Sequence, residues 1–417
     1  MKVLHVLAQL PDRTGSGVYF RNVIDGLAAK GLDQALIYGQ QSPFSFDFKN
    51  MACYPVTFQS DQVPFPIAGM SDVMPYEHTV YSQMSAEQVQ IWQDAFIQQL
   101  QTARQEFQPD IIISHHLWYL TALVVDIFQD IPVIGVSHST DIRQAQRHPH
   151  LREAYCQGME RLDLVFSLTP ENKSDILATY PISENKIIVI GNGYNPEIFH
   201  QPDQTSKEDT SDTANQQINI LYAGKIAASK GVFEFVQTYP RLKERFPQVA
   251  FHLVGNGDDA SYQDLYQLAQ TNPDSDFYHR PSVPQKELAG LMRAYDIFVL
   301  PSYYEGLATI VLEAMACQMR VVVSDLAPLH QLLEGPINHS GMIEYVSLPR
   351  IYDQDQPVQE DLPDYIERLT LALTRQIQAV IDKEPIDHQV YQAIERFAWP
   401  QIINRQYHYI QELVQNT

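Results

Sequence analysis

Residues 294–323 limit the fold more than any other part of the sequence. Ala294 to Leu300 form a nearly continuous apolar run, a Glu-Gly turn follows at 305–306, and residues 309–316 are good helix formers. A second apolar run then begins at Val321. A strand, a turn, a helix and a second strand in this order are typical of a parallel sheet that is covered on both faces.

The same alternation of strand and helix recurs through most of the chain. Short apolar runs separated by helical patterns occur at residues 3–8, 36–38, 111–114, 133–136, 164–170, 187–190, 218–223 and 249–254. This pattern predicts an α/β protein with doubly wound sheets. Residues 201–217 contain almost no apolar side chain and are predicted to form a solvated loop between two domains. We therefore predict one domain at 1–196, joined by a final helix at 397–417, and a second domain at 197–396.

Length, composition and charge agree with two soluble domains. The chain has 417 residues, of which 45% are hydrophobic and 19% charged, and its net charge is −22. A charge of this sign argues against nucleic acid and anionic membrane surfaces as partners. Three cysteines without paired spacing indicate neither disulfides nor a zinc site. Because no window approaches 18 apolar residues and the first apolar run is short, we expect no transmembrane helix, no signal peptide and a cytoplasmic location.

The turn at 305–306 joins two carboxylates to a helix start. Glu305 lies in the turn and Glu313 inside the following helix, and the free N–H groups between them favour a phosphate. Lys225 and Lys230 lie in another strand-to-helix loop of the same acidic domain, where they are candidate phosphate ligands. The alternative is a surface helix and two lysines that are merely solvated.

The first domain carries polar residues after several predicted strands. Gly15 and Gly17 lie between the first strand and a long helix, where glycine allows a tight turn, although the third glycine of the dinucleotide fingerprint is missing. His138 follows an apolar strand, with Asp141 nearby, and is predicted to contact a ligand. Residues 41–85 are predicted to be an irregular, packed loop that shapes a substrate cleft.

Two adjacent histidines follow residue 114 and are not predicted to bind a metal or to take part in catalysis. His115 and His116 lack the carboxylates and spacing of a metal site, so they are predicted to be structural or to line the cleft.

Six sequence blocks in order carry a resemblance to a known family. They are the glycine loop at 15–17, Gly191–Pro196, the Gly224-Lys225…Lys230-Gly231 segment, Val254–Gly257, Glu305-x7-Glu313, and Phe397-Ala-Trp399. In this combination the chain resembles the GT-B glycosyltransferases, in particular the retaining family 4, over nearly its whole length. The resemblance implies two Rossmann-like domains facing across a cleft, with the last helix crossing back to the first domain.

The resemblance also implies roles for individual residues. Glu305 would contact the donor sugar and His138 would lie beside it, as the catalytic pair. The lysines Lys225 and Lys230 would hold the pyrophosphate, and Glu313 the ribose. The remaining donor-side candidates are Gly15, Gly17, Arg280, Gly306, Leu307, Ala308 and Thr309. The implied donor is a nucleotide-diphosphate sugar, with UDP as the expected nucleotide, and neither a metal nor another cofactor is implied.

Two departures from the family pattern stand near these residues. Lys225 replaces the more common arginine, which loses bidentate geometry while keeping the charge. After Cys317 the sequence Gln318-Met-Arg320 replaces the usual Gly-x-Pro, a change that bears on the tight turn before Val321.

The acceptor and two alternative functions stay open at this level. Residues 1–110 hold only six Lys/Arg, so a small molecule, a glycan or a protein is expected as acceptor in place of a membrane lipid. The acceptor-side candidates are Tyr19, Asp72, Tyr76, His78, Trp118 and Asp141. The alternatives to a retaining hexosyltransferase are a nucleotide-sugar 2-epimerase of the same fold and an inactive sugar-nucleotide-binding subunit.

Overall fold

The chain folds into two compact α/β units. The computed structural model describes residues 1–417 except 73, 203–216, 271–275, 354 and 417. The N-terminal unit comprises Met1–Asn192 and Trp399–Thr417, and the C-terminal unit comprises Gly193–Ala398. These limits fall within a few residues of the predicted boundaries. The predicted solvated loop at 201–217 lies almost entirely outside the described residues.

The N-terminal unit is built on a seven-stranded parallel sheet with the order β3-β2-β1-β6-β7-β8-β9. Its elements are β1 (Lys2–Leu7), α1 (Gly15–Ala28), β2 (Asp33–Gln40), β3 (Ala52–Thr57), β4 (Ala68–Gly69), β5 (Thr79–Val80), α2 (Ala86–Glu106), β6 (Ile111–His115), α3 (Tyr119–Ile127), β7 (Val133–Val136), α4 (Thr140–Arg147), α5 (Pro149–Tyr155), β8 (Leu164–Ser167), α6 (Pro170–Thr179), β9 (Ile187–Val189) and α15 (Trp399–Asn416).

The C-terminal unit is built on a six-stranded parallel sheet with the order β12-β11-β10-β13-β14-β15. Its elements are β10 (Ile218–Ala223), α7 (Val232–Gln237), α8 (Tyr239–Arg245), β11 (Val249–Val254), α9 (Asp259–Gln270), β12 (Phe277–Arg280), α10 (Gln285–Ala294), β13 (Ile297–Leu300), α11 (Thr309–Ala316), β14 (Arg320–Ser324), α12 (Ala327–Asn338), β15 (Ile343–Val346), β16 (Ile351–Tyr352), β17 (Gln356–Pro357), α13 (Leu362–Ile381) and α14 (His388–Glu395).

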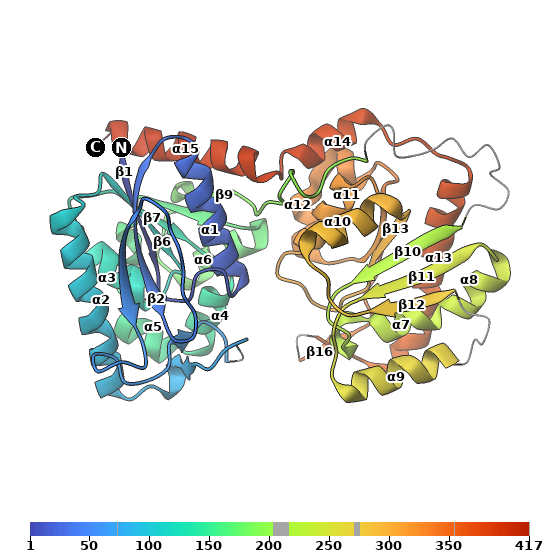
Figure 1. Ribbon diagram of the computed structural model, residues 1–417, viewed down its shortest axis with the longest axis horizontal. Helices are drawn as coiled ribbons and strands as arrows, with labels where there is room; N and C mark the ends of the chain where they lie inside the picture. Colours follow the sequence, from blue (N-terminus) through green and yellow to red (C-terminus); the bar gives the residue numbers. More distant parts are fainter. Residues whose placement is uncertain (73, 203–216, 271–275, 354, 417) are drawn as a thin grey trace. The chain divides into compact units, whose positions relative to one another are not determined.

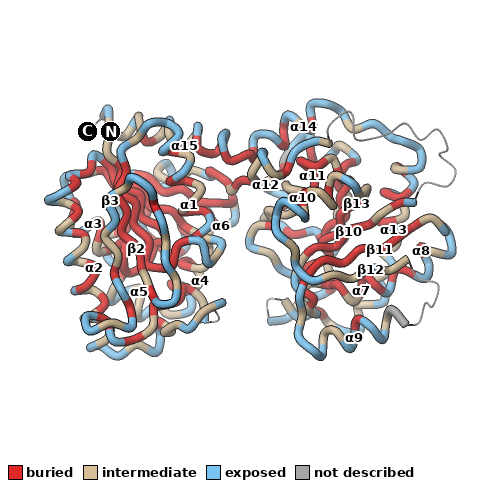
Figure 2. Tube along the Cα trace, in the orientation of Figure 1, coloured by how far each residue is buried: buried red, intermediate tan, exposed pale blue. Residues whose placement is uncertain are grey.

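Helices cover both faces of each sheet, which explains the apolar strands of the sequence. In β1, Leu4 and Val6 pack in a cluster with α2 and α3, whereas Val3 packs in a cluster with α1 and α15. In the C-terminal unit, Leu221 faces α11 and Tyr222 faces α7 and α13. Figures 1 and 2 show each buried sheet between its helical layers. The predicted α/β class with two doubly wound, Rossmann-like domains is confirmed.

The last helix packs on the N-terminal unit, as the sequence resemblance implied. A methyl group at Gly26 of α1 would lie 2.5 Å from Cγ1 of Ile403 in α15, so the two helices approach closely there. Arg405 donates a hydrogen bond to the carbonyl oxygen of Ile190 at 3.0 Å. The final helix predicted at 397–417 begins at Trp399, and Pro400 lies in the first turn of α15, where a missing N–H has no cost.

The prediction of an irregular segment at 41–85 was wrong for residues 52–57. These residues form β3, which pairs in parallel with β2 at the edge of the sheet. Pro55 lacks a backbone donor, which an edge strand tolerates, and most of the strand's side chains are not buried, so the apolar run of an inner strand is absent. Elsewhere in the segment, β4 and β5 form a short parallel pair, and Phe58, Val63 and Ile67 belong to the core, as expected of a packed segment.

Candidate functional site

In the C-terminal unit, the turn between β13 and α11 carries Glu305. Two buried hydrogen bonds hold the start of this turn from α13. The hydroxyl of Tyr365 lies 3.0 Å from the carbonyl oxygen of Pro301 and 2.8 Å from the hydroxyl of Ser324. Because a carbonyl only accepts, the single hydroxyl proton of Tyr365 goes to Pro301, and Ser324 donates to Tyr365. The backbone before Glu305 is therefore fixed by a residue 60 positions further along the chain.

The same turn is locked against the loop that carries Lys230. The N–H of Tyr303 donates to the carbonyl oxygen of Ser229 at 3.1 Å. Gly231 has a φ of +63°, and a Cβ there would lie 2.0 Å from the carbonyl oxygen of Pro301, so only glycine fits. These contacts hold two loops that follow the neighbouring strands β10 and β13.

Between these loops Lys230 and Glu305 form an ion pair. Their Nζ and Oε1 atoms are 2.8 Å apart, and the two side chains are 28% and 22% exposed. The pair lies at the carboxyl ends of parallel strands, the edge at which open α/β sheets bind ligands. A partly buried cation next to an acceptor can bind a phosphate and a sugar hydroxyl side by side.

Glu313 lies one turn into α11 and has a different environment. Its burial raises the pKa of the carboxyl group to about 7. A ligand hydroxyl that donates a hydrogen bond to this carboxyl group would stabilise its charged form.

The prediction that N–H groups from Gly306 to Thr309 all face a phosphate is corrected at one position. The N–H of Thr309 donates to the carbonyl oxygen of Leu307 at 2.9 Å. Helix α11 begins only at Thr309, and Ala308 occupies its N-cap position. Gly306 and Leu307 therefore belong to the turn before the helix.

Lys225 and Arg280 lie on two further strand ends of the same sheet. Lys225 is exposed after β10 and lines a hollow of about 520 Å³ with Asn256, Gly257, Asp258 and Ser282. Arg280 ends β12, and its carbonyl oxygen accepts the N–H of Gly255 at 3.0 Å. The sequence reasoning noted the Gly-Asn-Gly block but did not assign Asn256, Asp258 or Ser282 to the site, although the strand end before Gly255 was the available signal.

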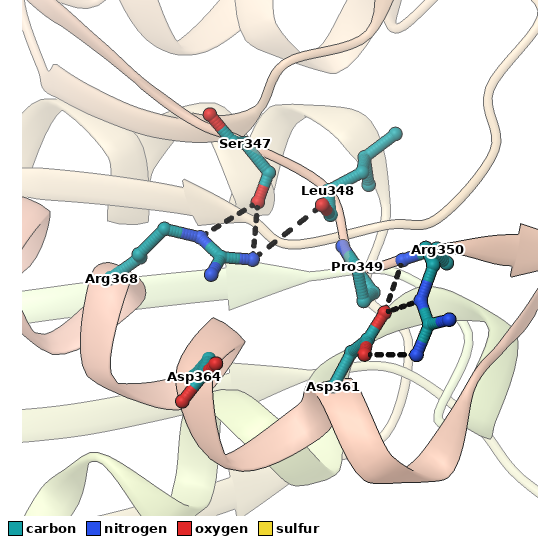
Figure 3. Close-up of a pocket in the computed structure, with 7 residues that line it drawn as sticks. All are labelled: Ser347, Leu348, Pro349, Arg350, Asp361, Asp364 and Arg368. Atoms are coloured by element: carbon teal, nitrogen blue, oxygen red, sulfur yellow. Dashed lines mark hydrogen bonds and ion pairs between the residues drawn. The ribbon is translucent and has the colours of Figure 1, made fainter.

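A second hollow of the C-terminal unit, about 320 Å³ in volume, contains none of the predicted residues. It lies between the end of β15 and the start of α13 (Figure 3). Its charges are largely paired within the protein. Arg350 forms an ion pair with Asp361 at 2.8 Å, and Arg368 donates to the carbonyl oxygens of Ser347 and Leu348.

In the N-terminal unit, the two loop glycines have different surroundings. A Cβ at Gly17 would lie 2.8 Å from the backbone of Leu10 and Asp12, and the Gly17 N–H donates to the hydroxyl of Thr14 at 3.1 Å. Gly17 is therefore required by the turn and the N-cap of α1, and its N–H is already engaged by Thr14, so its donor-side role stays a prediction. Gly15 has open space around its Cα.

His138 lies at the end of β7 in a cluster of imidazoles. Its Nε2 is 3.1 Å from Nδ1 of His115, and the ring of His116 lies 4.8 Å away. Burial lowers the pKa of His138 and of His115 well below the ordinary value, and that of His116 to about 3. The cluster is neutral near pH 7. His115 and His116 are buried, so their predicted structural role holds better than a lining role.

Three predicted acceptor-side residues are wrong as direct contacts, because each is buried within the N-terminal unit. Tyr19 accepts a hydrogen bond from Gln406 at 2.6 Å, and Trp118 packs on Tyr81 in the core. The carboxylate of Asp141 accepts the backbone N–H groups of Leu117 and His138 at 2.7 and 3.0 Å. All three side chains point into the interior of the unit, which leaves no direct contact with a ligand.

The other three acceptor-side residues are brought together in one loop. Nε2 of His78 lies 3.1 Å from the carbonyl oxygen of Asp72, and Nδ1 lies 3.2 Å from that of Tyr76. Asp72 is exposed, and Tyr76 and His78 are half-buried. Asp72 is open to solvent, whereas the hydroxyl of Tyr76 is buried and both ring nitrogens of His78 face carbonyl oxygens of the loop.

Two kinds of feature are absent from the described residues. Outside the gaps at 73, 203–216, 271–275, 354 and 417, the chain has no group of three or more His, Cys, Asp or Glu residues arranged to hold a metal ion. Across the same residues, no helix combines the length and apolar character needed to span a bilayer.

Comparison with known proteins places this arrangement in a family. A model described as Glycosyltransferase Family 4 matches residues 13–198, and one described as Glycosyl transferases group 1 matches residues 203–334. The sucrose-phosphate synthase structure from Thermosynechococcus elongatus has the same fold, with a TM-score of 0.63 at 17% identity over the full length of both chains. A glycosyltransferase structure from Rickettsia africae gives 0.66 at 14% identity, covering 100% of this chain and 99% of that one.

Curated relatives agree. The alpha-maltose-1-phosphate synthase of Mycobacterium tuberculosis is 24% identical over 310 residues, which are 70% of this chain and 76% of that protein. The enzyme of the same name from Mycolicibacterium smegmatis is 25% identical over 242 residues, or 53% of this chain, and the match spans only 61% of that enzyme's length. The fold and the matched models define a GT-B glycosyltransferase. The chain belongs to glycosyltransferase family 4.

Proposed function

We propose that this glycosyltransferase moves a hexose from a nucleotide-diphosphate sugar to an acceptor hydroxyl with retention of the anomeric configuration. The observation that carries the proposal is the Lys230–Glu305 ion pair at the carboxyl ends of β10 and β13. A cation at this position stabilises the charge that develops on a departing diphosphate. A carboxylate beside it can accept hydrogen bonds from the hydroxyls of the attached sugar. A structure of the same fold, Anabaena HepE, was solved in complex with UDP and glucose, which supports UDP as the nucleotide.

The proposed reaction is a substitution on one face of the sugar. The bond between the anomeric carbon and the diphosphate oxygen breaks, and its electron pair leaves with the diphosphate. The acceptor oxygen bonds to the anomeric carbon on the same face, and its proton passes to an oxygen of the leaving phosphate. In this scheme Lys225 and Lys230 neutralise the leaving group without a metal, and Glu313 holds the ribose hydroxyls.

His138 is proposed to lie beside the transferred sugar. Burial holds its imidazole neutral at pH 7, so it can donate a hydrogen bond without adding a positive charge next to the anomeric carbon. For the acceptor, a small molecule, a glycan or a protein remains the proposal, with Asp72, Tyr76 and His78 as its candidate contacts.

A donor panel tests this function. The protein is incubated with UDP-, GDP- and dTDP-hexoses, with and without candidate acceptors, and free nucleotide and sugar products are measured. We expect nucleotide release that depends on one donor class and on an acceptor, and a product with the anomeric configuration of the donor. An epimerised donor formed without any acceptor, or an inverted product, would contradict the proposal.

A further inference from the structure

The imidazole of His115 contacts His138 from behind the site. His115 ends β6 and is fully buried, whereas His138 follows the neighbouring strand β7 and is partly exposed. The two rings are nearly parallel, with an angle of 17° and centroids 5.4 Å apart, and one nitrogen of each ring faces the other at 3.1 Å. Because only one hydrogen can lie between two neutral imidazole nitrogens, one ring donates and the other accepts.

The surroundings of His115 decide which ring donates. Its other nitrogen, Nε2, is buried and has no hydrogen-bond partner among the residues that the structure describes. If Nε2 carried the hydrogen, a buried N–H would be left unpaired, which proteins rarely tolerate. With the hydrogen on Nδ1, His115 donates to His138 and only a weak acceptor is left unpaired. The second arrangement is therefore favoured.

Other contacts keep His138 in place for this bond. The carboxylate of Asp141 accepts the backbone N–H of His138, and the ring of Tyr19 meets the imidazole edge-on at a centroid distance of 5.2 Å. His116 lies on a further side of the ring, and its own nitrogens make no bond to His138 within the described structure. The backbone and the ring plane of His138 are thus set by groups other than His115, which leaves the hydrogen position to His115.

We propose that His115 is a positioning residue that fixes the tautomer of His138. His115 donates its Nδ1–H to Nε2 of His138, so the hydrogen of His138 is on Nδ1 and that nitrogen is the donor offered to the bound sugar. The effect on transfer rests on the proposed role of His138 beside the sugar, whereas the tautomer itself does not. A neutral histidine in water exchanges between its two tautomers, so the contact selects one form before the substrate binds.

Nitrogen NMR of the full chain labelled with [15N]histidine tests the tautomer directly. The His138 signals are identified by their loss in His138→Asn. We expect protonated Nδ1 and unprotonated Nε2 in the wild type and in His115→Asn, because the asparagine amide can replace the Nδ1–H donor. In His115→Leu, which has no donor, the preference should disappear. The matched control is His116→Asn, which removes a neighbouring imidazole without removing the bond and should leave the tautomer unchanged.

The same variants test the consequence for transfer. His115→Leu should lower kcat/KM about tenfold, the loss expected for one misdirected hydrogen bond, and His115→Asn should restore most of it. Wild-type His138 protonated on Nε2, or an unchanged kcat/KM in His115→Leu, would overturn the inference. Unchanged transfer by His138→Asn would instead overturn the proposed role of His138 in transfer. The NMR result tests the tautomer independently of that role, so the two outcomes can be told apart.

Discussion

The two units prepare their candidate site residues in opposite ways. In the N-terminal unit, His138 lies among imidazoles and a tyrosine ring that burial keeps neutral. In the C-terminal unit, Lys230 and Glu305 form an ion pair with a distance of 2.8 Å between Nζ and Oε1. The difference follows from the part of the ligand that each group would bind, because a neutral donor suits a sugar hydroxyl, whereas a diphosphate requires cations.

The largest effect is expected when the cation of the C-terminal unit, Lys230, is removed. Lys230→Met should lower kcat/KM by about 10²- to 10³-fold, because a charged stabilising group of the leaving diphosphate is lost. Initial rates with the donor found in the panel measure this. The matched control is Lys243→Met, which removes an ion pair with Asp276 at the opposite, amino edge of the same sheet. Equal losses in both variants would show that the Lys230 effect is only structural.

A second test uses pH, because the buried histidines of the N-terminal unit and Glu313 of the C-terminal unit should change stability with opposite sign. In the N-terminal unit the folded pKa of His5 is lowered to about 4 and that of His116 to about 3, below the unfolded value of 6.5. Their contribution to stability is therefore present above pH 6.5 and is lost as the pH falls toward 3, by at least about 2 kcal/mol.

In the C-terminal unit the folded pKa of Glu313 is raised to about 7, above the ordinary value of 4.5. The folded state binds this proton more tightly than the unfolded state, so stability falls as the pH rises from 4.5 to about 7, by about 1–3 kcal/mol. Glu313→Gln should remove that loss.

The tryptophans allow the units to be followed separately. Trp92, Trp118 and Trp399 all lie in the N-terminal unit and are the only tryptophans of the sequence. Denaturant titrations by tryptophan fluorescence at pH 5 and 7.5 therefore report that unit, and hydrogen exchange in α11 and β14 reports the other. Because burial also lowers the pKa of His252 in the C-terminal unit to about 4, which acts against Glu313, the effect of Glu313 is read as the difference between the wild type and Glu313→Gln. Equal shifts in these two proteins would contradict the comparison.

A smaller effect is expected from the hydroxyl that fixes the Glu305 turn. Tyr365→Phe leaves the carbonyl oxygen of Pro301 without its buried donor, so kcat should fall about tenfold as Glu305 loses its fixed position. The control is Tyr345→Phe, which loses its hydroxyl bond to Asn338 away from the turn, whereas Tyr365→Phe loses the bonds to both Pro301 and Ser324. Initial rates measure kcat, and a comparable fall in kcat in both variants would mean that the turn is not the cause.

The smallest effect concerns backbone strain, which both units contain at residues other than glycine. His116 and Gln318 both adopt left-handed φ angles, +71° and +68°, although neither is glycine. Gln318→Gly should stabilise the protein by about 0.5–1 kcal/mol, because glycine adopts this conformation without a Cβ clash. Gly341 has nearly the same φ of +72° with open space around it, so Gly341→Ala should destabilise by a similar amount. Denaturant titration measures both, and a destabilised Gln318→Gly would contradict the reasoning.

The sequence predicted the sheets well because inner parallel strands such as β13 are apolar on both faces. It missed β3, whose edge position permits Pro55 and exposed side chains. It predicted that Lys230 and Glu305 both follow strands of one sheet, but their pairing depends on β10 and β13 being neighbours. The sequence lacks the family's glycine in the tight turn before Val321. In the structure Gln318 adopts the left-handed conformation of that turn.

The direction of side chains was the second property that the sequence did not predict. A residue just past a strand can turn outward or into the core, and local sequence does not distinguish the two. Asp141 turns inward to cap backbone N–H groups, whereas Asp72 stays exposed. The contact between His115 and His138 likewise depends on the pairing of β6 with β7, which no local pattern encodes.

The central claim is that Glu305 acts on the sugar of a donor whose nucleotide is held by other groups of the C-terminal unit. The most direct test compares Glu305→Gln with Glu313→Gln by calorimetric binding of the free nucleoside diphosphate and by transfer rate. The account predicts that Glu305→Gln binds the nucleotide as the wild type does but transfers at least about 10²-fold more slowly, whereas Glu313→Gln weakens nucleotide binding itself. Wild-type transfer by Glu305→Gln would contradict it.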